Sequence, residues 1–272
     1  MLAGMLELPA SEKPRAIALF AHCFTCGKDI VAASRIGRAL AKHGIGVLRF
    51  DFTGLGSSDG DFGHTSFSSN IEDLLSAAEF LEKHYQAPRM IIGHSLGGAA
   101  MIAAADKIPD AKALATIAAP ADPEHVGKLF DARRAEIEGR GEAEVDLAGR
   151  KFTIRKHFLD DISGTTLTEC LNRMRKALLV MHGPRDNVVG IDNATAIFTA
   201  AKHPKSFVSL DDADHLLARR ADAVYAAQVL AAWAARYLDI PQASTTEADT
   251  GPEPMPDGVV VQETGAGPFA NR

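Results

Sequence analysis

The stretch Met90-Ile-Ile-Gly93-His-Ser95-Leu-Gly97-Gly98 decides how the rest of the chain is interpreted. A short apolar run ends at Gly93, and a small, Ala-rich segment with helical character follows from Leu96 to Ala105. A G-x-S-x-G pattern between a strand and a helix is typical of a nucleophile elbow, a turn so tight that small residues must flank the serine. The free N–H groups of the helix then face a developing oxyanion. The alternative, a chance match with Ser95 facing solvent, is disfavoured by the strand before it and the helix after it.

Outward from this turn, short apolar runs alternate with longer segments of helical period. The expected strands are Ala16–Ala21, Gly46–Phe50, Met90–Gly93, Ala113–Ala118, Ala177–Met181 and Ser206–Leu210. The expected helices are Ile30–Ala41, Ile71–His84, Leu96–Ala105, Ala194–Ala201 and Ala221–Leu238. Strands that alternate with helices imply a mostly parallel sheet with helices on both faces, which is an α/β fold.

Residues 1–240 are expected to form one domain around this sheet. The region 123–171 interrupts the alternation with a charged helix, Glu124 to Arg140, and a hairpin at Ala148-Gly149. We interpret it as a small cap insertion over the carboxyl edge of the sheet, where loops gather in such folds. The alternative is a surface excursion without a role in a site. Residues 241–257 have the composition of a flexible linker, and residues 258–272 are interpreted as the truncated start of a following domain.

Composition excludes several classes of function. The 272 residues are 46% hydrophobic and 24% charged, as in ordinary globular proteins. The formal net charge of −6 gives no electrostatic reason to expect a nucleic-acid partner. No run of about 18 apolar residues predicts a membrane span, and the N-terminus lacks the basic region of a secretory signal. A cytoplasmic protein is therefore expected, without membrane association.

A serine hydroxyl is a weak nucleophile and needs a base, and the base needs an acid to orient it. The chain has ten histidines. His215 is preferred because it follows the last strand and so ends at the carboxyl edge beside the elbow, whereas His182 ends an earlier strand. Asp186 lies in a turn just beyond the strand Ala177–Met181. Three rival carboxylates, close to His215 in the sequence, are expected in turns or on the surface: Asp211, Asp212 and Asp214.

The loop after the first predicted strand, Phe20 to Gly27, is expected to hold the second oxyanion donor. We expect the backbone N–H groups of Phe24 and Leu96 to form the oxyanion hole. Side chains expected to contact substrate are those beside the elbow and in this loop, namely His22, Cys23 and His94.

Two further motifs have competing interpretations. Cys23-Phe-Thr-Cys26 is a C-x-x-C pattern, but it does not open a helix of a thioredoxin-like unit, and no second pair completes a zinc site. Three cysteines in 272 residues do not make a disulfide framework, so two buried thiols are the simpler expectation. The turn Gly54 to Gly60 resembles a dinucleotide fingerprint, but Asp59 replaces its third glycine and no helix opens there, so a structural turn is favoured. No metal or organic cofactor is expected.

Four stretches together resemble a known family: Phe20–Asp29, Arg49–Gly56, Gly93–Gly98 and His203–His215. They are similar to the α/β-hydrolase half of bacterial proteins in which a hydrolase is fused to an OsmC-type domain. The resemblance covers roughly residues 2 to 240. It extends more distantly to feruloyl and cinnamoyl esterases, which carry glycine where Cys23 stands. It implies an α/β-hydrolase fold with Ser95, Asp186 and His215 as the triad, whose chain order also fits this fold.

The resemblance implies a serine carboxylesterase that cleaves small carboxylic esters through an acyl-enzyme. A thioesterase or peptidase on the same triad, or a poorly active binding module, remains an alternative because one fold supports many chemistries. The chain departs from the whole fusion at both ends. It begins at what looks like the second strand, and only Gly258 to Gly265 resembles the opening of an OsmC-type domain, the one covalently linked partner expected.

Overall fold

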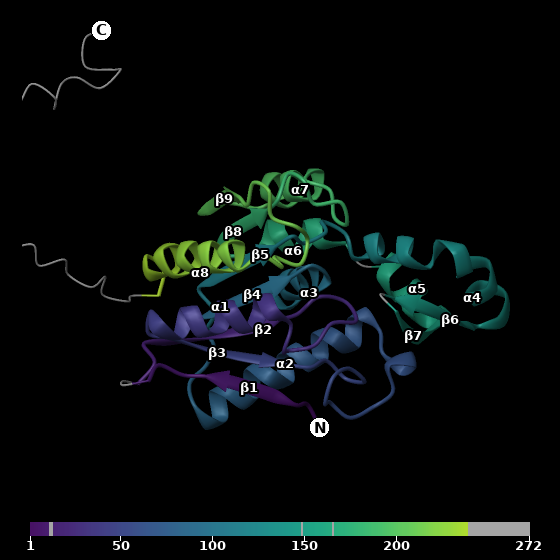
Figure 1. Ribbon diagram of the computed structural model, residues 1–272, viewed down its shortest axis with the longest axis horizontal. Helices are drawn as coiled ribbons and strands as arrows, with labels where there is room; N and C mark the ends of the chain where they lie inside the picture. The colour runs from purple at the N-terminus through teal and green to yellow at the C-terminus, as the bar shows by residue number, and fades with distance from the viewer. Residues whose placement is uncertain (11–12, 148, 165, 239–272) are drawn as a thin grey trace, which may run out of the picture. The chain divides into compact units, whose positions relative to one another are not determined.

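The computed structural model describes residues 1–10, 13–147, 149–164 and 166–238, and Met1–Ile240 make one compact unit (Figure 1). The centre of that unit is a seven-stranded sheet in the order β1-β3-β2-β4-β5-β8-β9. All neighbouring strands are parallel except β1, which pairs antiparallel with β3. The strands are β1 (Gly4–Glu7), β2 (Ala16–Ala21), β3 (Ile45–Phe50), β4 (Met90–His94), β5 (Ala113–Ile117), β8 (Ala177–His182) and β9 (Lys205–Ser209). This confirms the predicted α/β fold.

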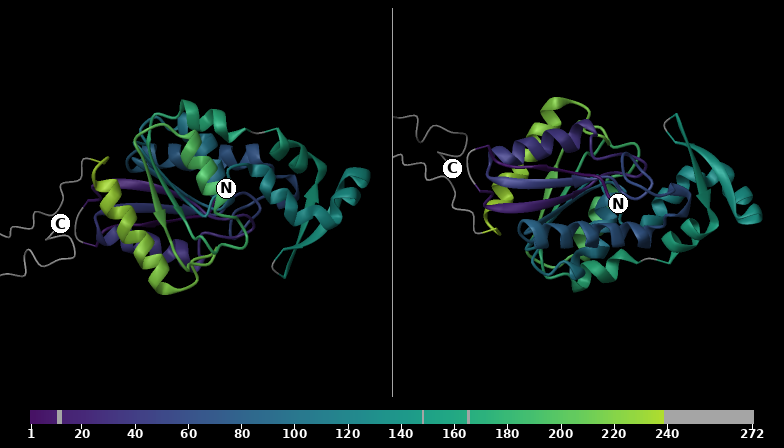
Figure 2. Two further views of the ribbon diagram at one scale, coloured as in Figure 1. Left: turned by 90° about the horizontal axis from the view of Figure 1, so that it is seen from above. Right: turned by 90° about the horizontal axis from the view of Figure 1, so that it is seen from below.

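Helices cover both faces of the sheet (Figure 2). One face packs against α1 (Val31–Lys42) and α8 (Arg220–Ala235). The other face packs against α2 (Phe67–His84), α3 (Leu96–Ala104), α6 (Leu167–Arg173) and α7 (Asp192–Ala200). Because both faces are covered, the central strands β2, β3, β4, β5 and β8 are buried along their whole length, which explains why their sequences are mainly apolar and do not alternate.

The first strand was not among the predicted ones. β1 precedes Ala16–Ala21 in the chain and lies at the edge of the sheet, where its residues are exposed or half-buried. It is only four residues long, has no β-branched residue and does not alternate, so it carries none of the sequence signals of a strand. It pairs with β3 along all four residues, and Glu7 adds an ion pair at 2.9 Å with the buried guanidinium of Arg49 on β3.

The chain between β5 and β8 leaves the sheet at its carboxyl edge (Figure 1). It forms η3 (Pro123–Arg133), α4 (Arg134–Arg140), the hairpin β6 (Glu142–Leu147) and β7 (Arg150–Arg155), and α5 (Lys156–Ser163). The single helix predicted over 124–140 is two helices, a 3₁₀ segment and an α-helix. Arg133 leaves helical geometry between them (φ −118°, ψ 0°), although Val126, Phe130 and Ile137 keep helical spacing on the buried side. The last helix of the predicted insertion, α6, packs with α3 and α7 in the layer over the sheet.

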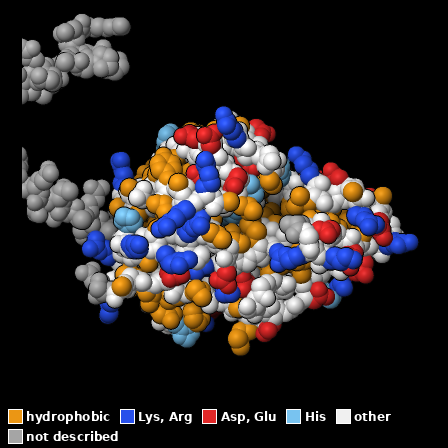
Figure 3. All heavy atoms as spheres, in the orientation of Figure 1, with side chains coloured by type: hydrophobic (Ala, Val, Ile, Leu, Met, Phe, Trp, Pro, Cys, Tyr) orange, Lys and Arg blue, Asp and Glu red, His pale blue; other side chains and the backbone are white. Residues whose placement is uncertain are grey.

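Some predictions fall outside the described residues: the linker 241–257, the domain start at 258–272, and Ala148 of the hairpin turn. Within the described part, no helix is long and apolar enough to cross a membrane. On the face drawn in Figure 3, acidic and basic side chains are interspersed.

Candidate active site

Ser95 lies in a sharp turn between β4 and α3. Its backbone has φ 54° and ψ −128°, a strained conformation for a residue with a side chain, of the kind that concentrates at functional sites. The turn requires glycine on both sides. A Cβ on Gly93 would lie 2.4 Å from the carbonyl oxygen of Gly97, and one on Gly98 would lie 2.6 Å from the Cβ of Ala119. The G-x-S-x-G sequence is therefore a steric requirement of this turn.

Gly97→Ala is expected to lower both stability and activity. Its Cβ would lie 2.4 Å from the carbonyl oxygen of His22, and backbone on both sides leaves little room to relax. We expect a loss of about 1–3 kcal/mol in the free energy of unfolding. Displacement of the His22 loop from Ser95 should also lower kcat by about 10- to 100-fold.

The matched control is Gly139→Ala in α4, where nothing lies within 4 Å of the new Cβ. This variant should gain about 0.5–1 kcal/mol, since alanine is the better helix former, and keep its activity. Denaturant unfolding and initial rates measure both. Equal behaviour of the two variants would contradict the steric account of the elbow.

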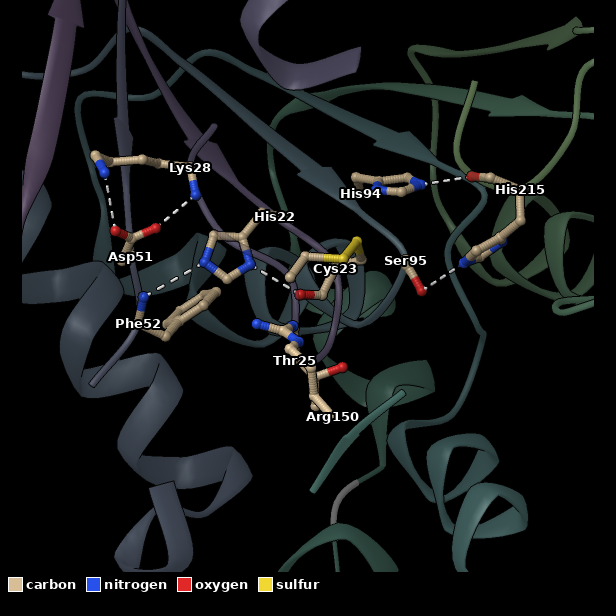
Figure 4. Close-up of a disulfide and its surroundings, with 11 residues drawn as sticks. His22, Cys23, Thr25, Lys28, Asp51, Phe52, His94, Ser95, Arg150 and His215 are labelled. Carbon is tan, nitrogen blue, oxygen red and sulfur yellow. Dashed lines mark hydrogen bonds and ion pairs between the residues drawn. A yellow bond between two sulfur atoms is a disulfide. The ribbon is translucent and has the colours of Figure 1, made fainter. Parts of the chain in front are cut away.

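The structure brings Ser95, His215 and Asp186 together. His215 Nε2 lies 3.0 Å from Ser95 Oγ, as Figure 4 shows, and His215 Nδ1 lies 2.8 Å from Asp186 Oδ2. All three residues are buried. Asp186 also accepts, at Oδ1, the N–H groups of Val188 and Val189. Burial alone would raise the pKa of Asp186, but these hydrogen bonds from His215, Val189 and Val188 outweigh it and hold the pKa below its ordinary value.

The rival carboxylates have other partners. Asp211 bonds to Ser209, Asp212 pairs with Arg185 and Asp214 accepts the N–H of Ala218. The rival base, His182, is buried behind Asp186, with Nε2 2.8 Å from the carbonyl oxygen of Val189 and 3.8 Å from Asp186 Oδ2. A carbonyl only accepts, so His182 donates to it and secures the loop that carries Asp186.

His94 holds the backbone of the loop that carries His215. Its Nε2 lies 2.7 Å from the carbonyl oxygen of His215 (Figure 4), so Nε2 carries the proton and donates. Its Nδ1 is buried without a hydrogen-bond partner in the described part of the protein. Burial, and then the charge of His215, lower the pKa of His94 from 6.5 to about 4. His94, expected to contact substrate, is instead a neutral buried support for the base.

The low pKa of His94 predicts a loss of stability in acid. In the unfolded chain His94 binds a proton below about pH 6.5, whereas in the folded protein it becomes protonated only near pH 4. The unfolded state therefore binds more protons between these pH values, and the free energy of unfolding falls as the pH drops through this window. The difference amounts to about 2 kcal/mol at pH 5 relative to neutral pH. His94→Gln keeps a donor but does not titrate, and should flatten the decline by this amount in urea unfolding at the two pH values. An unchanged slope would contradict the assignment.

The loop after β2 lies against the elbow, as predicted. Phe24 and Leu96 line one small cavity of about 10 Å³ beside this loop. In the described part of the chain, neither backbone N–H donates to a protein acceptor, which leaves both available to an oxyanion. His22 is 1% exposed and holds the loop in place: Nδ1 donates to the carbonyl of Cys23, and Nε2 accepts the N–H of Phe52. Its side chain has protein partners on both sides, and burial lowers its pKa.

Cys23 and Cys26 are joined by a disulfide, with Cα atoms 5.3 Å apart. This corrects the expectation of two buried thiols. The spacing of a C-x-x-C pattern is the same in a dithiol, a disulfide and half of a zinc site, so only the loop geometry distinguishes them. Both sulfur atoms are used in the bond. Among the described residues, no group of three or more His, Cys, Asp or Glu side chains is placed to hold a metal ion.

Asp51, which the sequence did not single out as a site residue, anchors the same loop. Its carboxylate accepts the backbone N–H of Lys28 and pairs with the Lys28 ammonium at 3.0 Å (Figure 4). It also accepts the N–H of Ser57 in the glycine-rich turn. A Cβ on Gly56, at φ 55°, would lie 2.3 Å from this carboxylate. Gly56 therefore makes room for Asp51, which supports the structural interpretation of the turn over a nucleotide site.

The insertion between β5 and β8 closes over the loop after β2. The Phe24 ring packs between Phe130 of η3, Phe158 of α5 and Phe62, with ring centroids 5.5–5.8 Å apart. Arg150 of β7 donates to the carbonyl of Thr25. The insertion and the loop after β2 are thus in direct contact, and the role of the insertion as a cap over the site stays a prediction.

The chain is similar in sequence or in fold to several known proteins. The family described as serine aminopeptidase, S33, matches residues 12–136. The crystal structure of the esterase domain of a Rhodothermus marinus protein is 46% identical, covering 88% of this chain and 99% of that one, with a TM-score of 0.70. Est1E from Butyrivibrio proteoclasticus, solved with ferulic acid, is 19% identical over 88% of this chain and 96% of that one, with a TM-score of 0.72, and is similar in fold alone.

A mitochondrial palmitoyl-protein thioesterase of Rattus norvegicus, ABHD10, is 26% identical over 204 residues, which is 72% of this chain and 66% of the relative's length. Fold, elbow geometry and the near-complete match to the Rhodothermus marinus esterase domain lead to one conclusion: the chain belongs to the α/β-hydrolase family of serine hydrolases.

Proposed function

We propose that the protein is a serine esterase that hydrolyses small carboxylic esters through an acyl-enzyme on Ser95. The observation that carries the proposal is the continuous hydrogen-bonded chain from Ser95 through His215 to Asp186, accompanied by the N–H groups of Phe24 and Leu96, which have no protein acceptor among the described residues. This is the arrangement that acyl transfer requires: a nucleophile, its base, an orienting acid and an oxyanion site.

The reaction follows from these positions. As Ser95 Oγ bonds to the ester carbonyl carbon, His215 Nε2 takes the hydroxyl proton over the 3.0 Å that separate them. The N–H groups of Phe24 and Leu96 stabilise the oxyanion of the tetrahedral intermediate. When the C–O bond to the alcohol breaks, His215 returns the proton to the leaving oxygen. Water repeats the sequence on the acyl-enzyme, with His215 again as base and then acid, and frees Ser95.

The cavity beside the oxyanion site favours a short acyl group. Its free volume of about 10 Å³ is room for about one water molecule, and its walls are mainly apolar, with Phe52, Leu55 and Ala100 among them. With Phe24 and Phe62 also in its walls, this small space should accept an acetyl group with less displacement of the walls than a long acyl chain.

Hydrolysis of p-nitrophenyl esters from acetate to decanoate tests the proposal. We expect kcat/KM to be highest for the shortest chains and to fall as the acyl group outgrows the cavity. A fluorophosphonate, which reacts only with an activated serine, provides a readout that does not depend on substrate choice. If no ester is hydrolysed and Ser95 is not labelled, the binding-module alternative replaces the esterase.

A thioesterase is the second candidate, because the rat and mouse relatives are named palmitoyl-protein thioesterases. The same triad serves both reactions, but a thiol, with a pKa near 8.5, leaves without full protonation by His215. An oxygen ester and a thioester with the same acetyl group separate the two. Labelling of Ser95 together with preference for the thioester by tenfold or more in kcat/KM would overturn the esterase assignment in favour of the thioesterase.

A further inference from the structure

We propose that Cys23 and Cys26 form a thiol–disulfide exchange site that controls the oxyanion hole. The oxidised form holds the loop in its active geometry, and reduction by a dithiol lowers the activity of Ser95. The proposal deepens the proposed esterase function and rests on it. It begins from the place of the disulfide between Cys23 and Cys26 (Figure 4). This bond closes a ring that includes the intervening residues Phe24 and Thr25.

The backbone within this ring needs an external constraint. Thr25 has φ 57°, a conformation that is unfavourable for a β-branched residue. Such strain persists only where the surrounding structure over-determines it. The covalent link across four residues, together with the hydrogen bond from the N–H of Cys26 to the carbonyl of Cys23, supplies that constraint. Opening the link gives Thr25 a route to relax.

A change in the backbone of Thr25 would affect the oxyanion site through the adjacent residue, Phe24. The N–H of Phe24 is one of the two oxyanion donors, and Phe24 and Leu96 line the same cavity. The loop also packs directly against the elbow. The carbonyl oxygen of His22, the residue before Cys23, is so close to Gly97 that a Cβ on Gly97 would lie 2.4 Å from it. A rotation of the peptide before Phe24 therefore moves a donor away from the oxyanion without disturbing the triad.

Other contacts keep the loop folded when the disulfide opens. Asp51 holds the backbone and side chain of Lys28, the Phe24 ring packs against Phe130 and Phe158, and Arg150 bonds to the carbonyl of Thr25. The effect of reduction is thus confined to the short segment inside the ring. It should appear in kcat rather than in the stability of the whole domain.

The dithiol supplies both of the electrons that reduction of the Cys23–Cys26 disulfide requires. A thiolate of the reagent attacks Sγ of Cys26, which is half-buried, whereas Cys23 is only 4% exposed. The S–S bond breaks, Cys23 leaves as a thiolate and takes up a proton, and a mixed disulfide remains on Cys26. The second thiol of the reagent then attacks the reagent's other sulfur, which is bonded to Cys26 in the mixed disulfide, and Cys26 is released. Two electrons pass to the protein, which gains two thiols, and the reagent becomes a cyclic disulfide.

The test compares oxidised and reduced forms of the full chain. Native thiol titration should find one thiol in the oxidised protein, Cys170, and three after dithiothreitol. With the reagent removed under anaerobic conditions, kcat for p-nitrophenyl acetate should be about 10-fold lower in the reduced form, less than the 10²–10³ expected for complete loss of a donor. Reoxidation by oxidised dithiothreitol should restore it.

Cysteine variants separate the disulfide from other thiols. Cys170→Ser should respond to dithiothreitol as the wild type does, since burial raises the pKa of the Cys170 thiol and Cys170 lies outside the loop. The double variant Cys23→Ser/Cys26→Ser should have the low kcat of the reduced form and ignore the reagent. Circular dichroism should be unchanged between the oxidised and reduced wild type.

Three outcomes contradict the proposal in different ways. If the protein with one thiol and the protein with three thiols have the same kcat, the disulfide does not control the oxyanion hole, although it does undergo exchange. A titration that still finds one thiol after dithiothreitol would overturn the exchange. An oxidised protein that hydrolyses no ester and is not labelled by a fluorophosphonate would overturn the proposed function, and this proposal with it.

Discussion

Ser95→Ala is expected to lower kcat for p-nitrophenyl acetate by on the order of 10⁵- to 10⁶-fold. Without Oγ, no acyl-enzyme forms, and His215 has no hydroxyl to deprotonate at the 3.0 Å position it occupies. The residual rate would come from direct attack of water on the ester, with the N–H groups of Phe24 and Leu96 still stabilising the oxyanion. Stability should change little, because alanine also fits the tight turn.

The matched control is Ser209→Ala at the end of β9, whose hydroxyl bonds to Asp211 and not to His215. It should keep the wild-type rate within about twofold, as surface substitutions usually do. Comparable activity of Ser95→Ala and the wild type would show that another group is the nucleophile and would remove the basis of the proposed mechanism.

Asp186→Asn is expected to lower kcat by about 10⁴-fold through the wrong tautomer of His215. Oδ1 of residue 186 accepts two N–H groups, from Val188 and Val189. An asparagine keeps those bonds only with its oxygen in that place, so its NH₂ must face His215 Nδ1. His215 then accepts at Nδ1 and carries its proton on Nε2, where it cannot take the proton of Ser95.

Asp212→Asn is the control for this variant. Asp212 lies in the loop before His215, but its carboxylate is exposed and pairs with Arg185. Initial rates should be close to wild type for Asp212→Asn and about 10⁴-fold lower for Asp186→Asn, with circular dichroism showing that both fold. A loss of less than tenfold in Asp186→Asn would mean that another acid orients His215.

Much of the fold was predictable because its strands are buried on both faces. Ala16–Ala21 and Ala177–Met181 are runs of apolar residues without alternation, and each lies in a strand of the parallel sheet. The predicted Ser95, Asp186 and His215 lie together because each follows the end of a strand. Parallel strands end at the same edge of the sheet, so the position of each residue just after a strand is enough to predict that the three meet. Their assignment as a catalytic triad stays a prediction until the variants above are measured.

The parts that were missed depend on tertiary contacts. Strand β1 is short, exposed and held at the edge by pairing with β3, so its own residues carry no signal. The roles of His94 and Asp51 follow from partners more than 20 residues away in the chain. No local pattern indicates that the ring of His94 meets the carbonyl of His215 or that Asp51 holds the loop at Lys28.

The position of His215 after β9 also sets when the protein acquires activity. Its carbonyl is held by His94 and its ring by Asp186 and Ser95, groups that follow or end two separate strands, β4 and β8. During synthesis the N-terminal strands leave the ribosome first, yet the base arrives only with the last strand. The nascent chain is thus catalytically silent until nearly the whole domain has been made. In refolding, recovery of turnover should mark the final docking of this loop and follow the recovery of secondary structure.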